Sequence, residues 1–329
     1  MQKVFVTGAD GMLGSSICRE LLQQKYLVKA MCLPGRKTNT LNDIPIEKVT
    51  GDISDKQFLL KEMAGCNFVI HVAALTNVWP RRMTKLMKIN LQGTRNVMEA
   101  AEELALDRMI HIGTACSFSH GTKSKPGDES DQFDGWKYKM DYITSKFLAQ
   151  QMLLKRFNET GFPVVIINPT YMIGPFDSGP SSGQMLIAIY KNSLKWYCSG
   201  GKNFVYSVDV AKAAVNSIYS GVPGNCYIAG NENLEFREFF DKVCKQLNKQ
   251  FEMKYAPNFL LISIGILNSI FAFITRKQPK ISYGMAVLAK ENQYFSSAKA
   301  RRVLNMPQTP IEVGIEHSIT WFKQNKYIQ

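Results

Sequence analysis

The sequence predicts an α/β protein with a doubly wound parallel sheet and a smaller, partly helical C-terminal lobe. Short apolar, β-branched runs alternate with amphipathic stretches over the first half of the chain, which is typical of parallel βαβ units. A glycine-rich loop directly follows the first run. After Pro169 the alternation becomes irregular, beginning with the loop FDSGPSSG, and this indicates a second lobe.

The elements follow in order along the chain. We expect strands over residues 3–7, 27–33, 68–72, 108–112 and 164–168, with a further strand ending just before Gly51. Helices are expected over about 13–24, 91–104 and 142–158. Right-handed crossovers then place the carboxyl ends of all strands at one edge, where a ligand binds. We expect residues 1–170, joined by elements from about 204–230, to form the nucleotide-binding domain, and residues 171–203 and 231–329 to form the substrate lobe.

The glycine loop TGADGMLG spans residues 7–14. Gly8 permits a tight turn, Gly11 lets the backbone approach a pyrophosphate, and Gly14 allows close packing of the following helix. The helix N-terminus offers free N–H groups and a positive dipole end. The loop therefore predicts a Rossmann-like dinucleotide site, whose expected cofactor-binding residues here are Gly8, Asp10, Gly11, Met12, Leu13 and Gly14.

The end of the second strand bears on which dinucleotide binds. An acidic residue there would hold the ribose 2′-hydroxyl of NAD, but the strand ends MCLPGRK, without a carboxylate. Arg36 and Lys37 are positioned to pair with a 2′-phosphate. We expect NADP as the cofactor, with NAD possible; the alternative is that both cations are exposed loop charges.

Two further strand ends contribute to the predicted cofactor site. Asp52 is placed to accept from the adenine amino group and Ile53 to cover the ring, although Asp52 is also a candidate helix N-cap. After the fourth strand, small residues let the backbone run close to the cofactor. We interpret His71 as structural. The expected contacts after this strand are Val72, Ala73 and Ala74.

Tyr142 and Lys146 form the only Tyr-x-x-x-Lys pair in the sequence. A spacing of four puts both side chains on one helix face. An ammonium beside a phenol favours the phenolate, so we expect Lys146 to lower the pKa of Tyr142. The tyrosine then serves as proton donor to a carbonyl, or as base towards an alcohol. Lys146 can also hold ribose hydroxyls.

The chain resembles the extended short-chain dehydrogenase/reductase family over nearly its whole length, with closest similarity to dihydroflavonol-4-reductase-like and 3β-hydroxysteroid-dehydrogenase-like members, including proteins called NAD-dependent epimerase/dehydratase. The motifs that carry the resemblance are TGADGMLG, GDISD, HVAA, NLQGTRNV, YITSK, NPTYMIGP and KNFVYSVDVAKA. It implies hydride transfer at nicotinamide, with a Ser or Thr polarising the substrate oxygen. Thr114 occupies that position, with Ser117 as the fallback. Asn90 matches the family's Asn-x-x-Gly-Thr position, and Pro169 matches a residue near the nicotinamide.

The resemblance also separates two functions. Asn168 stands where many sugar-nucleotide epimerases have Arg, and Tyr171 replaces an Asn that contacts the diphosphate. We therefore expect an NAD(P)-dependent oxidoreductase acting on the carbonyl or alcohol group of a hydrophobic or aromatic small molecule. The alternative enzyme is a nucleotide-sugar epimerase or dehydratase with tightly bound NAD; a non-catalytic cofactor-binding regulator is a third reading. Candidate pocket-lining residues, for which ordinary packing is the alternative, are Phe118, Trp136, Met172, Phe176 and Tyr206.

Composition and charge limit the kinds of partner that we expect for this chain. The net charge of +13 raises nucleic acid as a partner, but the basic residues are dispersed and no nucleic-acid motif accompanies them, so none is expected. The seven cysteines are scattered singly, which indicates neither a disulfide framework nor a metal site. The N-terminus MQKVFVTG has no signal-peptide pattern, so a cytoplasmic location is expected. A homodimer through the helices near 91–104 and 142–158 is possible by family analogy.

One apolar segment, PNFLLISIGILNSIFAFIT at residues 257–275, needs its own interpretation. It is short for a membrane-spanning helix and is interrupted by Ser263, Asn268 and Ser269. We expect a buried or lobe-packing helix. A membrane-surface helix ending on Arg276 and Lys277 is the alternative.

Overall fold

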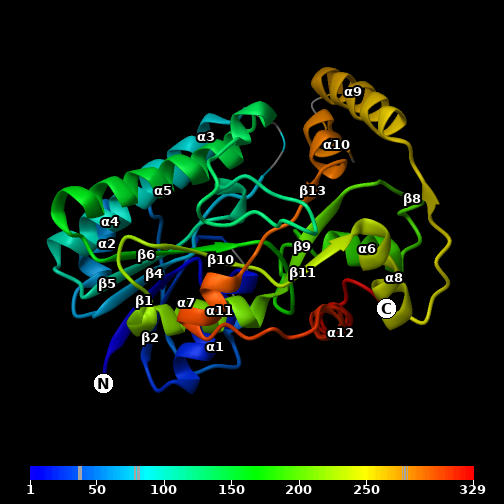
Figure 1. Ribbon diagram of the computed structural model, residues 1–329. Helices are drawn as coiled ribbons and strands as arrows, with labels where there is room; N and C mark the ends of the chain where they lie inside the picture. Colours follow the sequence, from blue (N-terminus) through cyan, green and yellow to red (C-terminus); the bar gives the residue numbers. More distant parts are fainter. Residues whose placement is uncertain (36–38, 78, 80–81, 276, 278, 280) are drawn as a thin grey trace.

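The computed structural model describes residues 1–35, 39–77, 79, 82–275, 277, 279 and 281–329. The chain forms a large α/β layer with a smaller layer beside it, and the C-terminus ends in the smaller one (Figure 1). Helices α9 and α10 lie together at one extremity of the molecule (Figure 1).

The large layer is a seven-stranded sheet in the order β10-β6-β5-β4-β1-β2-β3, and every neighbouring pair is parallel. Its strands are β1 (Lys3–Thr7), β2 (Leu27–Cys32), β3 (Glu47–Thr50), β4 (Phe68–His71), β5 (Arg108–Ile112), β6 (Val164–Pro169) and β10 (Cys226–Ala229). This confirms the predicted Rossmann-like sheet. The strand order reverses between β1 and β4, so the crevice expected to hold a ligand opens at their carboxyl ends.

Helices cover both faces of this sheet because successive side chains of each strand point to opposite faces. Val4 and Val6 of β1 belong to one apolar core, whereas Phe5 belongs to the other. On the first face lie α1 (Met12–Gln23), α7 (Ser207–Ser220) and α11 (Ala298–Leu304). On the second face lie α2 (Lys56–Met63), α4 (Thr94–Glu103) and α5 (Asp141–Thr160). Short α3 (Thr84–Met87) and a π-helical turn, η2 (Lys88–Gly93), lead into α4.

The smaller layer has its own sheet and core. Its sheet has the order β11-β9-β13, with β7 also paired to β9. Stacked Phe204 and Phe239 lie in the core beneath it, together with Phe322. The elements are β7 (Tyr171–Ile173), β9 (Gly201–Tyr206), β11 (Glu232–Glu235), β13 (Asn292–Gln293), α6 (Gln184–Tyr190), α8 (Phe236–Gln246) and α12 (Ile311–Gln324). A two-stranded ribbon, β8 (Trp196–Tyr197) and β12 (Lys254–Tyr255), leads to α9 (Asn258–Thr275) and α10 (Tyr283–Ala289).

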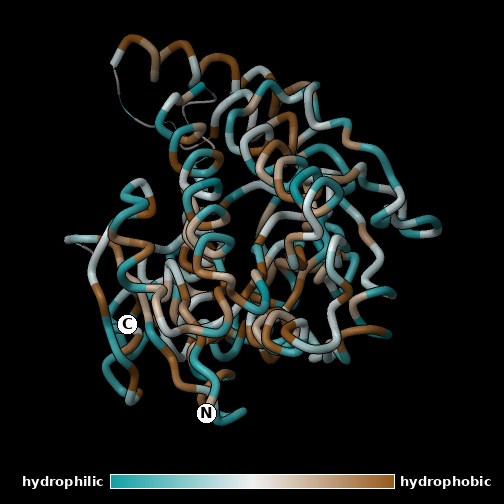
Figure 2. The backbone as a smooth tube through the Cα atoms, turned by 90° about the vertical axis from the view of Figure 1, so that its left-hand side faces the viewer, coloured by the Kyte–Doolittle hydropathy of each residue, from teal (hydrophilic) through white to brown (hydrophobic). Residues whose placement is uncertain are grey.

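Of the two forms expected for the apolar segment, a buried or a lobe-packing helix, the buried form is wrong and the lobe-packing form fits in part. The segment is helical as α9, and it packs against α10, but it buries only Leu261, Gly265 and Ala272. Figure 2 shows it as a hydrophobic segment at the edge of the molecule. The physical reason is length, because the seven residues of α10 cannot cover the eighteen of α9. Among the described residues, α9 is the one helix long and apolar enough to cross a membrane.

Candidate active site

Two glycines of the loop between β1 and α1 are required by the approach of other backbone atoms. Gly8 has a φ of +66°, and a Cβ built there would lie 2.8 Å from the Cα of Ala73. A Cβ on Gly14 would lie 2.1 Å from the carbonyl oxygen of Gly8. At Gly11 a Cβ would meet only ordinary contact, at 3.5 Å from the Gly8 oxygen. The backbone at Gly11 is therefore open to a ligand, as a pyrophosphate-binding loop requires.

The N-terminus of α1 suits an anion. Gly11 is its N-cap, and no side chain caps the helix. Leu13 turns its side chain into the core, whereas Met12 is half-buried at the rim. The carbonyl of Asp10 accepts a hydrogen bond from the Thr40 hydroxyl at 3.1 Å, which fixes the outer part of the loop. N–H groups of a first helical turn without a side-chain cap are a ready site for phosphate.

The residues that follow β3 differ in part from the contacts expected of them. Asp52 is not the helix N-cap: Asp55 caps α2, its side chain accepting from the Phe58 N–H at 3.0 Å. Asp52 instead accepts from the Ser54 N–H at 2.8 Å and remains partly exposed. Ile53 is 5% exposed and lies under Gly93, so little of its side chain is left to cover a ligand. Arg36 and Lys37 lie outside the described residues.

The fourth strand end is held by Thr7. Its hydroxyl oxygen accepts from the N–H groups of Val72 and Ala73, both at 3.2 Å, and lies 2.8 Å from His71 Nδ1. The other ring nitrogen of His71 lies 3.0 Å from the Thr94 hydroxyl. Burial, with Lys146 nearby, lowers the pKa of His71 to about 3. A neutral, doubly hydrogen-bonded ring fits the structural role expected for it. Val72, Ala73 and Ala74 remain half-buried at the sheet edge.

Asn90 clips this edge to helix α5. Its amide donates to the carbonyl of Leu75 at 2.9 Å and to the Ser145 hydroxyl at 3.0 Å. Its carbonyl oxygen accepts from the Leu75 N–H at 2.8 Å. Asn90 is 2% exposed; its bond to Ser145 is buried, and its bonds to Leu75 are partly buried. The residue therefore fixes the loop after β4 against the helix that carries Tyr142 and Lys146.

Three predicted catalytic side chains meet at the end of β5. Tyr142 and Lys146 lie on one face of α5, and a hydrogen bond joins the side chains of Tyr142 and Thr114. The Lys146 ammonium donates to the carbonyl of Ile112, the last residue of β5, at 2.5 Å. Thr114 also accepts from the Cys116 N–H at 3.3 Å. Ser117, the fallback hydroxyl, is buried without a hydrogen-bond partner among the described residues.

The protonation of the pair differs from expectation. Burial raises the pKa of Tyr142 well above its usual range, the Cys116 thiol adds to this, and the hydrogen bond with Thr114 opposes it. The expected lowering of the Tyr142 pKa by Lys146 is not found, and the Lys146 ammonium is directed to the Ile112 carbonyl. Burial lowers the pKa of Lys146 to about 8. At neutral pH the phenol is therefore protonated, and the amine still carries its charge.

Asn168 and Pro169 end β6 beside this group. The Asn168 amide donates to the carbonyl of Thr114 at 3.0 Å and to the Gln150 side chain at 2.8 Å. These bonds tie the β5 end, β6 and α5 together. Pro169 is buried in the sheet, in register with Ala229 of β10. The fixed spacing of Thr114 from α5 thus depends on Asn168.

The smaller layer brings to the site residues that sequence reasoning missed. Val287 and Leu288 of α10 share an apolar cluster with Tyr142 and Cys116. Lys202 of β9 donates to the Gln293 side chain at 2.5 Å; burial lowers its pKa, and its proximity to Cys116 and Cys198 opposes this. The sequence signals available were slight: Cys116 lies next to the predicted hydroxyl, and Lys202 opens the last family-like motif.

A further hydrogen-bonded group joins the two layers. Glu291, just after α10, accepts from the Tyr138 hydroxyl, and the His120 ring lies 3.0 Å from the same carboxylate. The carboxylate raises the pKa of Tyr138 further, on top of the larger effect of burial. Tyr138 belongs to the same cluster as Tyr142, so this group anchors α10 beside the site.

The predicted pocket-lining residues do not gather at one cavity. Phe118 and Met172 pack with the two large-layer cores, and Trp136 packs on Phe147 with half of its surface exposed. Phe176 lies under the Arg19 guanidinium, 4.0 Å from ring centroid to guanidinium carbon. With Tyr206 it lines a cavity of about 240 Å³ beside α1. Ordinary packing thus describes Phe118 and Met172, whereas Phe176 and Tyr206 line a cavity and Trp136 is half exposed.

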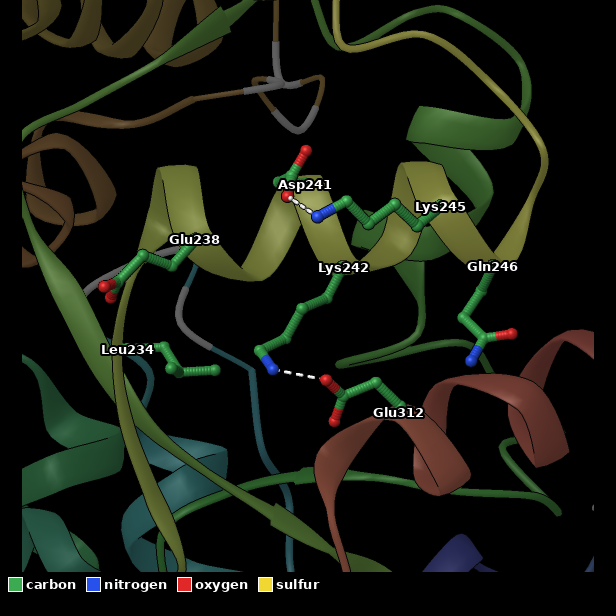
Figure 3. A pocket seen from close by; sticks show the side chains of 7 residues that line it. All are labelled: Leu234, Glu238, Asp241, Lys242, Lys245, Gln246 and Glu312. Carbon is green, nitrogen blue, oxygen red and sulfur yellow. Dashed lines mark hydrogen bonds and ion pairs between the residues drawn. The ribbon is translucent and has the colours of Figure 1, made fainter.

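A larger hollow of about 570 Å³ lies in the smaller layer, away from the predicted catalytic side chains (Figure 3). It opens between α8 and α12, where Lys242 pairs with Glu312 and Lys245 pairs with Asp241. The third acidic residue of its walls, Glu238, pairs with Lys123 outside the hollow. The lining residues are Leu234, Glu238, Asp241, Lys242, Lys245, Gln246 and Glu312.

Comparison with known proteins agrees with this geometry. Residues 4–230 match the model of the NAD dependent epimerase/dehydratase family. A protein of Synechocystis sp. provisionally named dihydroflavonol 4-reductase is 26% identical over 330 residues, covering 99% of this chain and 96% of the relative. Sterol demethylase protein B of Methylococcus capsulatus is 22% identical, covering 98% and 99%. The crystal structure of gox2253 superposes with a TM-score of 0.88 at 26% identity, covering all of both chains.

The family match spans more than half of the chain and includes the glycine loop, the clip at Asn90 and the group at the end of β5. Relatives of this kind are oxidoreductases and dehydratases that act on small molecules. The chain is therefore an enzyme of the NAD-dependent epimerase/dehydratase family, within the extended short-chain dehydrogenases/reductases.

Proposed function

We propose that this enzyme is an NADP(H)-dependent reductase of a carbonyl group on an apolar small molecule, or the corresponding alcohol dehydrogenase. The observation that carries the proposal is the meeting of Thr114, Tyr142 and Lys146 at the end of β5. Lys146 also acts electrostatically on His71 at the end of β4. This group therefore lies at the sheet edge that carries the glycine loop.

The side chains divide the work as follows. When bound, the nicotinamide nucleotide supplies or accepts the hydride. Tyr142, whose phenol is protonated at neutral pH, donates its proton to the carbonyl oxygen as negative charge develops there. Thr114 hydrogen-bonds the same oxygen and orients the phenol. The Lys146 ammonium donates to the Ile112 carbonyl, and its other N–H groups are proposed to hold ribose hydroxyls. In the oxidative direction the phenolate form of Tyr142 takes the alcohol proton.

The surroundings of Tyr142 favour an apolar substrate. The apolar cluster that contains Tyr142 also contains Met140, Ile143, Val287 and Leu288. These side chains favour an apolar substrate, because contact with them removes apolar surface from water. Asn168 and Tyr171 replace family residues typical of sugar-nucleotide epimerases and support the same choice.

Replacing Tyr142 with Phe tests the role directly. Aliphatic and aromatic ketones and aldehydes are screened by NADPH absorbance, and the best substrate is used to compare variants. Tyr142→Phe is expected to lower kcat at least 100-fold, in line with loss of a general acid. NADPH affinity, measured by calorimetry, should change less than about twofold, since a hydroxyl group alone is removed. Tyr219→Phe, on an exposed tyrosine, is the matched control. Full activity in Tyr142→Phe would overturn the assignment.

The choice of NADP rests on Arg36 and on the absence of a carboxylate at the end of β2. The Michaelis constant for NADPH is expected to be the lower one, and Arg36→Ala should raise it while leaving that for NADH nearly unchanged. A lower Michaelis constant for NADH in the unmodified enzyme would reverse this choice.

The family description favours one second candidate, a nucleotide-sugar epimerase or dehydratase with tightly held NAD. Such an enzyme would purify with NAD bound and would convert a nucleotide sugar without net consumption of NAD(P)H. A reductase consumes one NADPH for each carbonyl reduced. Extraction of the purified protein followed by nucleotide chromatography, together with the absorbance screen, separates the two.

A further inference from the structure

Helix α9 turns its apolar side chains outward. Every large apolar residue on its outer side is exposed, Phe273 by 78% of its surface, and Ser263 is the only polar residue among the exposed positions of the helix. A continuous exposed apolar surface of this kind is typical of an interaction site. The exposed apolar residues are Phe259, Leu260, Ile264, Ile266, Leu267, Ile270, Phe271, Phe273 and Ile274.

The inward side of the same helix carries the small and polar residues. Gly265 packs so tightly that a Cβ there would lie 2.9 Å from the Cβ of Ala286 in α10. Asn268 and Ser269 are half-buried on this side. A surface helix of a soluble protein has the reverse arrangement, with its apolar stripe towards the core. The outward side of α9 is therefore suited to contact with an apolar environment such as lipid.

The segment around α9 carries charge of one sign. From Met253 to Lys290 the sequence contains no Asp or Glu. Such a segment complements an anionic lipid surface, whose potential attracts Lys and Arg. A second copy of this chain would instead bring two sets of basic side chains together, with no acidic residue between them. The basic residues of the segment are Lys254, Arg276, Lys277, Lys280 and Lys290.

The N-terminal end of α9 and Ser269, in its second half, are hydrogen-bonded to neighbouring elements of the protein. The Asn258 side chain accepts from the Ser199 hydroxyl at 3.0 Å, and the Ser269 hydroxyl oxygen accepts from the Tyr283 N–H at 2.9 Å. Eighteen residues rise about 27 Å, close to the thickness of a bilayer core. A spanning helix would carry its C-terminal end to the opposite side of the bilayer, away from α10. The tethers are compatible with a helix lying in the interface plane.

We propose that α9 is an interfacial helix that docks this enzyme onto the surface of an anionic lipid bilayer. Its outer apolar side chains enter the boundary between headgroups and acyl chains. The flanking basic side chains, including exposed Lys254, Lys277 and Lys290, contact the acidic headgroups.

Co-sedimentation of the full chain with sucrose-loaded vesicles tests the proposal. Vesicles of phosphatidylcholine alone are compared with vesicles containing one third phosphatidylglycerol, at low and high salt. We expect strong binding to the anionic vesicles, weaker binding to the neutral ones, and release of the electrostatic part at high salt. Failure to bind either vesicle overturns the proposal. So does binding that resists high salt and alkaline carbonate together, because that indicates a spanning helix.

Two variants separate the contributions. The triple change Leu267→Ser, Phe271→Ser, Ile274→Ser should lower the partition coefficient on the order of 100-fold or more, because three apolar side chains no longer leave water. The change Lys254→Ser, Lys277→Ser, Lys290→Ser should lower it by roughly 100-fold on anionic vesicles only. Leu27→Ser, Leu33→Ser, Val222→Ser, on exposed residues outside α9, is the matched control and should bind normally.

Light scattering of the lipid-free protein tests the alternative that α9 binds a second copy of this chain. If wild type is a dimer that the apolar triple variant converts to a monomer, and neither binds vesicles, α9 is a contact between copies and the proposal fails. Vesicle binding does not depend on the catalytic assignment. Tyr142→Phe should bind vesicles as wild type does, so loss of one proposal leaves the other standing.

Discussion

Helices α5 and α9 have opposite relations between polarity and burial. In α5 the buried polar side chains of Ser145, Lys146 and Gln150 all have hydrogen-bond partners on neighbouring elements. In α9 nine large apolar side chains are exposed, and only Leu261, Gly265 and Ala272 are buried. In α5 the buried polar side chains hold the candidate active site together. In α9 the exposed apolar side chains are left for contact with another molecule or with lipid. Measurements of the free energy of unfolding for single substitutions in each region test this difference.

The largest effect is expected at the clip that holds α5. Asn90→Leu leaves both the N–H and the carbonyl of half-buried Leu75 without their partner, and two such groups cost at most about 4 kcal/mol together. Urea unfolding should show this loss in the free energy of unfolding. The exposed Asn42→Leu, used as the control, should change it by less than about 0.5 kcal/mol. An unchanged midpoint for Asn90→Leu would mean that the clip does not hold the helix.

A pH-dependent effect is expected at Lys146. Its pKa falls from 10.5 to about 8 on folding, so between these values the unfolded chain binds a proton that the folded chain does not. Stability therefore rises with pH across this window, by about 3 kcal/mol at most. Urea unfolding of wild type against Lys146→Met, at several pH values from 7 to 10.5, measures it. The difference should shift in favour of wild type as pH rises; a constant difference would show that Lys146 is not desolvated.

The inward side of α9 should respond moderately. Gly265→Leu places a side chain against Ala286 and the Ser282 carbonyl, and overpacking of this kind costs about 2 kcal/mol. Thermal unfolding should show the loss. Equal stability would mean that α9 and α10 separate freely.

The smallest effect is expected on the outward side of α9. Phe271→Ser removes an exposed side chain that contributes little to folding, so the free energy of unfolding should stay within about 0.5 kcal/mol of wild type. Leu153→Ala, on the buried side of α5, is the counterpart and should cost about 3 kcal/mol. A large loss for Phe271→Ser would contradict the exposed placement of α9.

Local patterns predicted most of the large sheet. The strands expected at 3–7 and 108–112 match β1 and β5 because each is a β-branched run bounded by polar or glycine residues. The helix expected from residue 91 begins instead with a π-helical turn over Lys88–Gly93, which a periodicity of 3.6 residues does not reveal. The short strands of the smaller layer were not foreseen, since they pair with partners far away in the sequence.

The site was predictable where it rests on strand ends. Thr114 and Tyr142 meet because one follows β5 and the other opens the next long helix. The protonation of Tyr142 was not predictable, because it depends on how deeply the phenol is buried. The contribution of α10 was also hidden, since Val287 lies far from Tyr142 along the chain. For α9 the apolar composition predicted a helix. Its exposure could not be predicted, because it depends on which other elements pack against it.

The packing and hydrogen bonds of Asn168 limit which residues can replace it. Its amide nitrogen lies 2.6 Å from where a Cβ on Gly113 would stand, and both of its hydrogens are taken by neighbours. Replacing Asn168 with the longer Arg would leave Gln150 without this partner and crowd Gly113 after the neighbouring strand. Such a replacement therefore needs compensating changes at the positions around it.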